Sequence, residues 1–481
     1  MLNRRNLFKM AAVGGAAAVL PWERLSASAS ASPAAAAAAA PTVPFAHAMT
    51  VPRVLAPVSR TASSDLYEIR MKEAQVEIVK GLRSTVRTYG GTFPGPTIRA
   101  SRGREVVLRQ INELSVNTAV HLHGGEVRSE HDGLPMDVIA PGGERTYRYP
   151  NEQRGASLWY HDHAHHLEGE NVFMGLQGMY LLSDTAEREL PLPSGDYDIP
   201  LVIREGRVEA DGSLVYTRPS DCSHMLVNGK ERPYFAVAAR KYRLRIYNAC
   251  INRYFRLRFA DGAAFTQIAT DGGLLEEPVE RTELLMMGGE RAEIVVDFSR
   301  YGVGGSVVLE NTAALSGERP EVMRFDVNRE AADNSSVPAR LSTIPPLPTP
   351  TVERSFELRT FPDMTINGKL YDPARVDVTA KLGATEVWTV RNMEAPIAAG
   401  QPDFHLWHSF HTHLTSFRVL ERNGKPATTR DAGLKDTVTL APDETVKLAM
   451  TWGPYTGQYL FHCHQLGHSG AGQMGRIDVV A

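Results

Sequence analysis

Apolar and polar residues alternate with a period of two along much of the chain. The clearest examples are residues 68–73, 106–111 and 242–247. Successive side chains of a β-strand point to opposite faces, so this pattern predicts strands that are buried on one face. Turns rich in Pro and Gly, such as residues 93–96 and 141–143, separate these segments. The pattern therefore predicts an all-β protein.

One segment of the sequence recurs. Residues 157–163 (SLWYHDH) match residues 458–464 (QYLFHCH), and residues 289–297 resemble a degenerate third copy without histidines. Three β-sandwich domains are therefore predicted, at residues 62–185, 195–330 and 352–481. The Pro-rich residues 344–351 are expected to link the second domain to the third.

The first 31 residues have the features of an export signal. A twin arginine, Arg4-Arg5, precedes a short apolar stretch, and small residues follow as candidate cleavage sites. The apolar stretch is too short to span a membrane, so we expect no membrane anchor. The twin-arginine export machinery moves folded proteins, so we expect export to the periplasm or the extracellular space. Residues 32–61, rich in Ala and Pro, are predicted to form a disordered linker.

Composition and charge narrow the function classes. The 481 residues are 43% hydrophobic and 22% charged, which is ordinary for a folded protein. The formal charge of -3 gives no reason to expect nucleic acid or an anionic membrane as a partner. The three cysteines, at 222, 250 and 463, are too few for a disulfide framework. Cys222 and Cys250 could pair, but we favour buried free thiols.

Histidine is the unusual residue type: there are 16, mostly in short clusters. Four clusters are formed by His121 and His123, by His161 and His163, by His408, His411 and His413, and by His462, His464 and His468. Residues i and i+2 of a strand share a face about 6–7 Å apart, so a His-x-His pair suits two neighbouring metal ions better than one. A single pair is weak evidence, but four clusters in repeat-related positions are strong evidence for a metal site.

Cys463 lies between two of these histidines. Alternation places Cys463 on one face of its strand and His462 and His464 on the other. One strand can thus contribute a thiolate to one metal site and imidazoles to another. His408 and His468 can complete a site of two histidines and one cysteine, the ligand set of a blue copper centre. A structural zinc protein is the alternative, but it would need neither eleven donors nor a cysteine between two histidines.

The four motifs resemble those of the multicopper oxidases, over about residues 65–481. Residues 413–420, 434–438 and 453–461 are most similar to bacterial spore-coat laccases and bilirubin oxidases, and residues 271–278 to bacterial cuprous oxidases. The resemblance implies three cupredoxin-like Greek-key β-sandwich domains. It also implies a trinuclear copper cluster between the first and third domains, with the second domain as a spacer.

The resemblance implies four copper ions and a division of the ligands among them. The type 1 copper would be bound by His408, Cys463 and His468, the type 2 copper by His121 and His411, and the two type 3 coppers by His123, His161, His163, His413, His462 and His464.

The family also implies the reaction. A small-molecule reductant gives single electrons to the type 1 copper, and each passes through Cys463 to His462 or His464. Four electrons then reduce dioxygen to two waters. We predict a phenol or aminophenol as the reductant, and a monomer. The cuprous-ion oxidases of the family carry a Met-rich insertion before the third motif, whereas Met364 and Met393 are isolated here. A cuprous-ion oxidase for copper tolerance and a non-catalytic copper-binding cupredoxin protein remain as alternatives.

The sequence leaves open which acid supplies protons to the cluster. Asp132 lies where similar bacterial enzymes have an acid near the cluster, so it is a candidate proton relay. Those enzymes carry a second acid after the last type 1 histidine, where this chain has Ser469. Glu126, Glu130 and Glu168 are the other candidate acids.

The axial ligand of the type 1 copper also departs from the family pattern. It usually lies ten residues after the cysteine, which leads here to Gln473, with Met474 one residue further. A step of one residue reverses the strand face, so only one of the two can face the metal unless the strand bulges. An unshifted strand favours Gln473.

Overall fold

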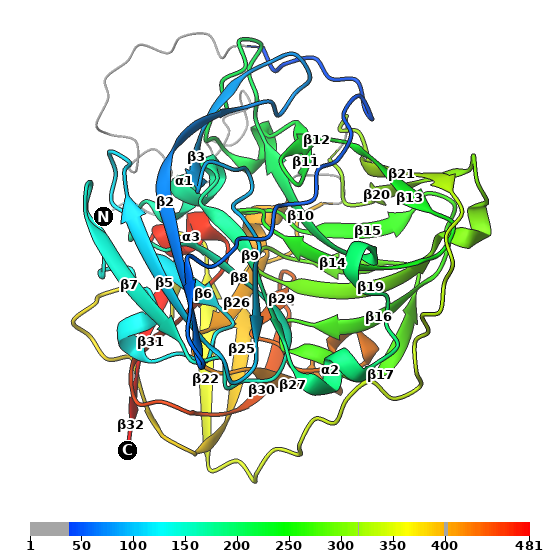
Figure 1. The fold of residues 1–481 in the computed structure, drawn as a ribbon. Helices are drawn as coiled ribbons and strands as arrows, with labels where there is room; N and C mark the ends of the chain where they lie inside the picture. Colours follow the sequence, from blue (N-terminus) through cyan, green and yellow to red (C-terminus); the bar gives the residue numbers. More distant parts are fainter. Residues whose placement is uncertain (1–37, 316, 399–402) are drawn as a thin grey trace. The chain divides into compact units, whose positions relative to one another are not determined.

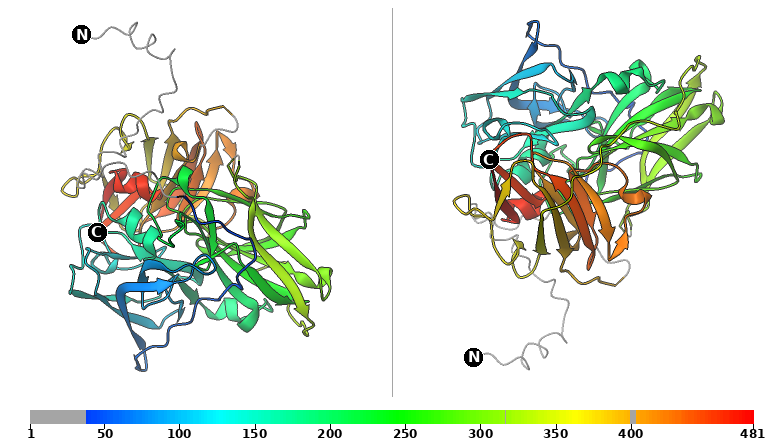
Figure 2. Two further views of the ribbon diagram at one scale, coloured as in Figure 1. Left: turned by 90° about the horizontal axis from the view of Figure 1, so that it is seen from above. Right: turned by 90° about the horizontal axis from the view of Figure 1, so that it is seen from below.

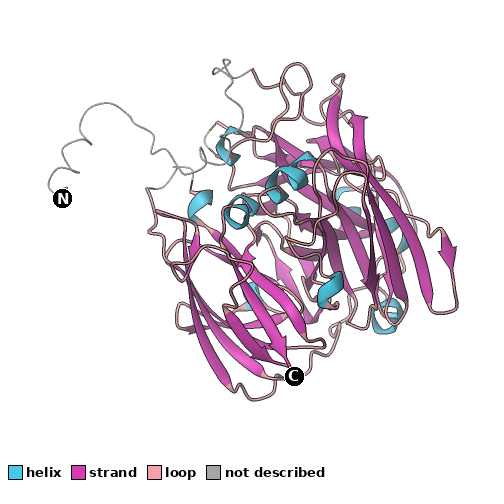
Figure 3. Ribbon diagram, turned by 90° about the vertical axis from the view of Figure 1, so that its left-hand side faces the viewer, coloured by secondary structure: helices cyan, strands magenta, loops and turns pink. Residues whose placement is uncertain are grey.

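The structure is a computed structural model that describes residues 38–315, 317–398 and 403–481. The predicted export signal and residues 32–37 lie outside the described residues. Strands dominate and helices are few and short (Figures 1 and 3). Among the described residues, no helix is both long enough and apolar enough to cross a membrane.

Domain 1 consists of a five-stranded and a four-stranded sheet. The first has the order β1 (Ser59–Arg60), β2 (Ser64–Val76), β5 (Glu105–Asn112), β7 (Glu144–Tyr149), with β3 (Ser84–Tyr89) also paired to β2. The second has the order β4 (Ile98–Ser101), β9 (Gln177–Ser183), β8 (Ala156–Asp162), β6 (Val120–His123). β5 alternates between buried and half-buried residues, as the sequence predicts for a strand with one face toward a core.

Domain 2 consists of a seven-stranded and a five-stranded sheet. The first has the order β12 (Lys230–Glu231), β11 (His224–Val227), β10 (Asp198–Gly206), β14 (Lys241–Asn248), β19 (Arg291–Asp297), β16 (Phe265–Thr270), β17 (Gly273–Arg281). The second has the order β13 (Tyr234–Ala238), β21 (Glu321–Arg329), β20 (Ser306–Asn311), β15 (Phe255–Phe259), β18 (Leu284–Met286).

Domain 3 consists of a six-stranded and a five-stranded sheet. The first has the order β23 (Thr365–Ile366), β22 (Val352–Arg359), β25 (Thr385–Asn392), β30 (Thr445–Thr451), β27 (Phe417–Arg422), β28 (Lys425–Pro426). The second has the order β24 (Val378–Lys381), β32 (Met474–Val480), β31 (Gly457–Cys463), β26 (His408–Thr412), β29 (Thr437–Leu440).

Each domain encloses its own apolar core between its two sheets. Leu108 of β5 and Tyr160 of β8 belong to the core of domain 1, and Trp388 of β25 and Phe461 of β31 to that of domain 3. A third core, around Leu244, joins the sheets of domain 2. Figure 2 shows the strands of domain 1 in blue and cyan, those of domain 2 in green, and those of domain 3 in yellow to red. The architecture is thus three β-sandwiches, as predicted.

Three short α-helices connect strands: α1 (Glu168–Met174), α2 (Thr185–Glu189) and α3 (Leu466–Gly470). α1 follows the second histidine cluster and α3 follows the fourth. Both helices therefore lie in the loops that leave the histidine-bearing strands.

The predicted linker, residues 32–61, is ordered in the part that the structure describes, so the prediction of disorder is wrong there. The Ala40 N–H donates to the Val208 carbonyl at 2.8 Å, and the Met49 N–H donates to the Tyr234 carbonyl at 2.7 Å. Both Ala40 and Met49 are buried. The small Ala side chains let this extended segment lie against domain 2, where its backbone groups find the partners that a loop normally takes from water.

β14 also differs from what its sequence pattern predicts. Residues 242–247 alternate as if one face met water, yet both faces are buried. The Arg245 guanidinium donates to Ser157 Oγ of domain 1 at 3.1 Å and pairs with Asp198 and Glu293 at 2.6 and 2.9 Å. The polar face is thus covered by an ion-pair network that contacts domain 1 rather than by solvent.

Candidate metal centre

The histidine clusters lie on two pairs of neighbouring strands. β6 and β8 of domain 1 are antiparallel, and His121 lies opposite His161. β26 and β31 of domain 3 are antiparallel in the same way, and His411 lies opposite His462. The register thus brings two His-x-His motifs together within each domain.

The two domains bring their histidines together in one buried site. The rings of His121 and His413 stack with their centroids 3.9 Å apart. Those of His123 and His411 stack at 3.8 Å. All ten clustered histidines and Cys463 are at most 3% exposed. The sequence repeat therefore produces one shared site between domains 1 and 3.

Donor atoms within this site form groups suited to metal ions. In the part of the chain that the structure describes, five groups have donor atoms within 4.8 Å of one another. Four consist of His and Cys alone: His121–His123–His161, His121–His411–His413, His163–His413–His462, and His408–Cys463–His468. The fifth is His123–His411–Asp436. His464 completes the eight cluster imidazoles, with its ring centroid 4.7 Å from that of His123 and 5.4 Å from that of His161. The structure therefore brings together all eleven donors that the sequence singles out.

Most of the cluster rings are oriented by a hydrogen bond to an oxygen. In six of the eight, Nδ1 faces a carbonyl or carboxylate oxygen at 2.6–3.0 Å, which directs Nε2 toward the other rings. Four rings face a backbone carbonyl: His121 that of Asp132, His161 that of Asp162, His411 that of Asp436, and His462 that of Cys463. Two rings face a carboxylate: His413 that of Asp132, and His163 that of Glu168. His123 and His464 are the exceptions. Nε2 of His123 contacts Asp436 and Thr437, both at 3.0 Å, so His123 presents Nδ1. Neither ring nitrogen of His464 has a hydrogen-bond partner.

The opposite ring nitrogens have no protein partner, which is the feature expected of metal donors. Buried nitrogens of this kind are Nε2 of His121, His161, His163 and His411, Nδ1 of His123, and both nitrogens of His464. The Nε2 atoms of His413 and His462 face only each other, at 3.3 Å. A buried polar atom without a hydrogen bond is costly, and coordination to a metal ion would remove that cost. The residues therefore fit bound metal.

Burial also sets the protonation state that metal binding needs. It lowers the pKa of nine of the ten imidazoles, so these are neutral at pH 7 and have a lone pair to donate. They are His121, His123, His161, His408, His411, His413, His462, His464 and His468. The exception is His163: burial would lower its pKa, but the facing Glu168 carboxylate raises it above its usual value.

Asp132 is placed beside the cluster. It follows a 3-10 helix, Ser129–His131, and its carboxylate is completely buried. Its Oδ2 lies 2.6 Å from Nδ1 of His413, and its backbone carbonyl lies 2.6 Å from Nδ1 of His121. Burial raises the pKa of Asp132 to about 6, so it can hold a proton near neutral pH.

Glu168, one of several candidate acids in the sequence, contacts both a cluster histidine and Ser469. It begins α1 and is completely buried, with Oε2 2.7 Å from Nδ1 of His163. Ser469 Oγ of α3 donates to the other oxygen of Glu168. Burial would raise the pKa of Glu168, but the His163 imidazole outweighs this and lowers it. A carboxylate of domain 1 thus lies between the cluster and Ser469 of domain 3.

Asp436 also contacts the histidine cluster, although the sequence did not single it out. Its carboxylate contacts His123 and accepts two hydrogen bonds from Arg291 of β19, at 2.7 and 2.6 Å. Lys435 and Asp436 lie within residues 434–438, which resemble bacterial laccases, and that resemblance was the signal for this contact. Domain 2, predicted as a spacer without histidine clusters, therefore supports the cluster through Arg291.

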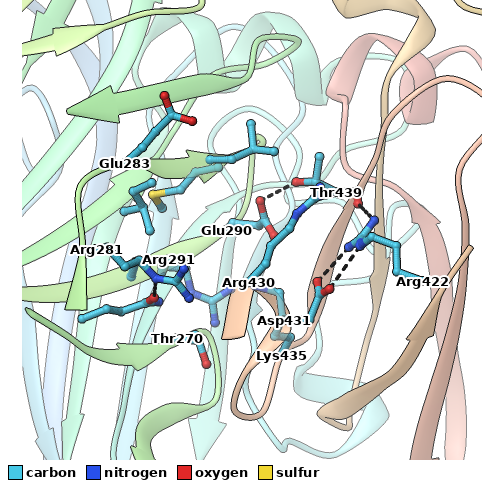
Figure 4. Close-up of a pocket in the computed structure, with 15 residues that line it drawn as sticks. Thr270, Arg281, Glu283, Glu290, Arg291, Arg422, Arg430, Asp431, Lys435 and Thr439 are labelled. Atoms are coloured by element: carbon cyan, nitrogen blue, oxygen red, sulfur yellow. Dashed lines mark hydrogen bonds and ion pairs between the residues drawn. The ribbon is translucent and has the colours of Figure 1, made fainter. Parts of the chain in front are cut away.

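A small polar cavity of about 50 Å³ lies where domains 2 and 3 meet, next to this contact. Figure 4 shows its lining, with Arg291 and Glu290 from domain 2 and Lys435 and Arg422 from domain 3. Lys435 pairs with Glu290 at 3.1 Å and with Asp271 at 3.3 Å. These ion pairs of Lys435 join the two domains at the cavity.

The second donor group lies on the opposite face of β31. Cys463 Sγ is 3.4 Å from Nδ1 of His408 and 3.6 Å from Nδ1 of His468. His462 and His464, on either side of Cys463, belong to the histidine cluster. The alternation expected for a His-Cys-His strand is therefore present, and adjacent residues join the two sites. A thiolate with two imidazoles suits copper or zinc.

Gln473 immediately precedes β32, and Met474 is the first residue of that strand. Met474 is the register partner of His462, so both side chains point to the cluster side of the sheet. The Cys463 N–H donates to the Gln473 carbonyl at 3.2 Å, which puts Gln473 beside Cys463. The strand is unshifted, as the count of ten residues assumes.

The two remaining cysteines belong to none of these donor groups. Cys222 and Cys250 are both buried and both free. Burial raises the pKa of each thiol, which keeps both in the unreactive neutral form.

Comparison with known proteins identifies the family. Residues 70–187 and 345–481 each match the family described as multicopper oxidase. The chain is 34% identical to a laccase of Bacillus subtilis over 90% of this chain and 98% of the relative, and 38% identical to the bilirubin oxidase of Albifimbria verrucaria over 84% and 74%. Its fold is similar to the crystal structure of a laccase from Pediococcus acidilactici, with a TM-score of 0.83 at 29% identity, covering 92% and 95% of the two chains. The chain therefore belongs to the multicopper oxidase family and is a copper-dependent oxidase.

Proposed function

We propose that this enzyme is laccase-like: it takes single electrons from phenolic or aminophenolic substrates and uses four electrons and four protons to reduce dioxygen to two waters. The observation that carries the proposal is the His462-Cys463-His464 segment. It presents a thiolate to one donor group and two imidazoles to another, so adjacent residues connect the place where electrons enter to the place where oxygen is reduced.

We propose four copper ions for the eleven donors. The type 1 ion would be held by His408, Cys463 and His468, the type 2 ion by His121 and His411, and the type 3 pair by His123, His161, His163, His413, His462 and His464. Copper bound there supplies the one-electron redox chemistry. The complete burial of the cluster excludes bulk water and bulky reductants, so only small species such as dioxygen and water can reach it.

The protein also has to supply protons, because each dioxygen consumes four. Asp132, whose pKa burial raises to about 6, can hold a proton at a carboxylate in contact with His413. Glu168, whose pKa is lowered, is instead an ionised carboxylate that faces His163. The two acids contact different rings from different loops of domain 1. Asp132 is therefore the candidate proton donor, and Glu168 is a candidate proton acceptor on the other side of the cluster.

An organic reductant is favoured by the residues near the type 1 donors. Trp407, which precedes His408 in the chain, packs against Tyr254 with ring centroids 4.2 Å apart. Both donate to Asp403, the indole N–H at 2.9 Å and the phenol O–H at 3.0 Å. Aromatic faces beside a carboxylate acceptor suit an aromatic donor that carries O–H or N–H groups. The names of two relatives, laccase and bilirubin oxidase, point in the same direction.

Location and assembly are further parts of the proposal. The Arg4-Arg5 pair and the short apolar stretch after it support export by the twin-arginine route, to the periplasm or beyond. All eleven donors belong to one chain, so a monomer has a complete set.

The test combines metal content with substrate turnover on copper-loaded protein. We expect about four copper ions per chain, a blue colour, and faster oxidation of aminophenols and phenols than of cuprous ion. Cys463→Ser should remove the blue absorption and the oxidase activity together, because no other group replaces the thiolate. Cys222→Ser, which changes a buried thiol outside both sites, is the matched control and should keep both.

The alternatives predict different results. Faster turnover of cuprous ion would indicate the metal-oxidising function, and bound copper without any oxidase activity would indicate a storage or binding protein. Zinc in place of copper, or a colourless protein that still oxidises substrate, would refute the proposal.

A further inference from the structure

The type 1 donors have a fourth polar neighbour, because the Gln473 side chain lies beside His408 and His468. We infer that the side-chain oxygen of Gln473 is the axial ligand of the type 1 copper and that it restricts the enzyme to electron-rich reductants. The inference rests on the proposed function, because it requires copper at His408, Cys463 and His468.

The first support is the position of the Gln473 backbone. Its N–H donates to the His468 carbonyl at 3.0 Å, and its carbonyl accepts from the Cys463 N–H at 3.2 Å. Gln473 is therefore tied by its backbone to two of the three type 1 donors. A shift of one residue, which Met474 would need to reach the metal, would break both hydrogen bonds.

The second support is the face on which Met474 lies. Met474 pairs with His462 across β31 and β32, so its thioether is directed to the same side as the His462 ring. That side is the histidine cluster. In the observed register, Met474 cannot face the sulfur of Cys463. Of the two residues, only Gln473 can therefore be a ligand of the type 1 copper.

The third support is the orientation of the Gln473 amide. Its Nε2 donates to the carbonyl of Arg359 at 2.8 Å and to that of Thr365 at 3.3 Å. Carbonyls only accept, so the amide nitrogen must face them and the oxygen must face the other way. The oxygen is buried and has no hydrogen-bond partner. Because β22 and β23 hold the amide in this orientation, its oxygen is directed toward the His408 and His468 rings.

The chemical consequence concerns the redox balance of the site. An amide oxygen is a harder ligand than a thioether, so it stabilises the cupric form relative to the cuprous form and lowers the reduction potential. A low potential weakens the driving force for taking an electron from the substrate. Aminophenols and hydroquinones, which lose an electron readily, should therefore be oxidised well, and simple phenols poorly.

The experiment compares Gln473→Met with Met474→Leu in copper-loaded protein. Redox titration of the blue absorption and the electron paramagnetic resonance spectrum of the type 1 copper are the readouts. Gln473→Met should raise the equilibrium constant for reduction of the site at least tenfold, which is about 59 mV for one electron. It should also change the spectrum and widen the substrate range toward simple phenols. Met474→Leu should leave both readouts as in the wild type.

Other outcomes overturn the inference. A shift with Met474→Leu and none with Gln473→Met would make Met474 the ligand, and no shift with either would mean that neither residue binds. If Gln473→Met does not fold, a crystal structure of the copper-loaded wild type decides the question, since it shows directly whether the amide oxygen or the thioether faces the metal. Absence of a blue type 1 copper in the wild type would instead refute the proposed function itself.

Discussion

Asp132→Asn separates proton supply from the positioning of the ligands. The Asn side chain keeps an oxygen that can accept from His413, and the backbone carbonyl of residue 132 still accepts from His121. The change removes the negative charge and the ability to hold a proton. The structure therefore predicts that most of the positioning is retained while the acid–base function is lost.

The size of the effect distinguishes the two roles. Loss of an outer contact to a metal-binding histidine costs roughly 10–100-fold in activity or metal affinity. Loss of a general acid costs roughly 10²–10⁴-fold, or about 2.7–5.4 kcal/mol in the barrier. Since Asn preserves the hydrogen bond to His413 at the same atom, we expect a loss above 100-fold in the rate at which dioxygen reoxidises the reduced enzyme.

The pH dependence follows from the pKa of Asp132, which burial raises to about 6. A proton donor must be protonated, so reoxidation by wild-type enzyme should slow as the pH rises through this pKa. Bound copper ions add positive charge and lower the pKa, which puts the inflection at or below pH 6. Asn does not titrate, so the variant should lack this inflection.

The assay is stopped-flow mixing of fully reduced protein with dioxygen, followed by the return of the blue absorption. Reduction of the oxidised protein by an aminophenol under anaerobic conditions should be unchanged, because Asp132 does not contact the type 1 donors. Asp137→Asn, at a partly exposed acid on the same loop that pairs with Arg145, is the matched control. Wild-type reoxidation kinetics with an unchanged pH profile in Asp132→Asn would remove Asp132 from the mechanism.

Two further predictions test the supports around the cluster. Glu168→Gln should reduce copper retention or oxidase activity by roughly 10–100-fold, because it breaks the contact with a ligand histidine, whereas Glu170→Gln on the exposed side of α1 should have little effect. Equal copper content and activity in both variants would contradict this. Arg291→Met should lower the stability of the metal-free protein by about 3–5 kcal/mol in denaturant unfolding, because it leaves Asp436 buried without its partner. Arg430→Met, at a partly exposed pair, should cost at most about 1 kcal/mol, and equal losses in the two variants would refute the role of the buried pair.

The sequence determined the features that depend on local spacing. Alternation over residues 106–111 predicted a strand with one buried face, and that strand is β5. The spacing of His462, Cys463 and His464 predicted donors on two faces of one strand, because period-two geometry follows from the backbone alone. The motifs also identified the family. These inferences need only information that neighbouring residues carry.

Only the tertiary structure decided which distant groups meet. The pairing of domains 1 and 3 brought Asp132 to His413, and the approach of α1 to α3 brought Glu168 to Ser469. Packing against domain 2 ordered the stretch around Ala40, which composition alone predicted to be disordered. The orientation of the Gln473 amide depends on carbonyls of β22 and β23 that lie more than 100 residues away. Such contacts arise from the packing of whole domains, and no pattern within a short segment carries that information.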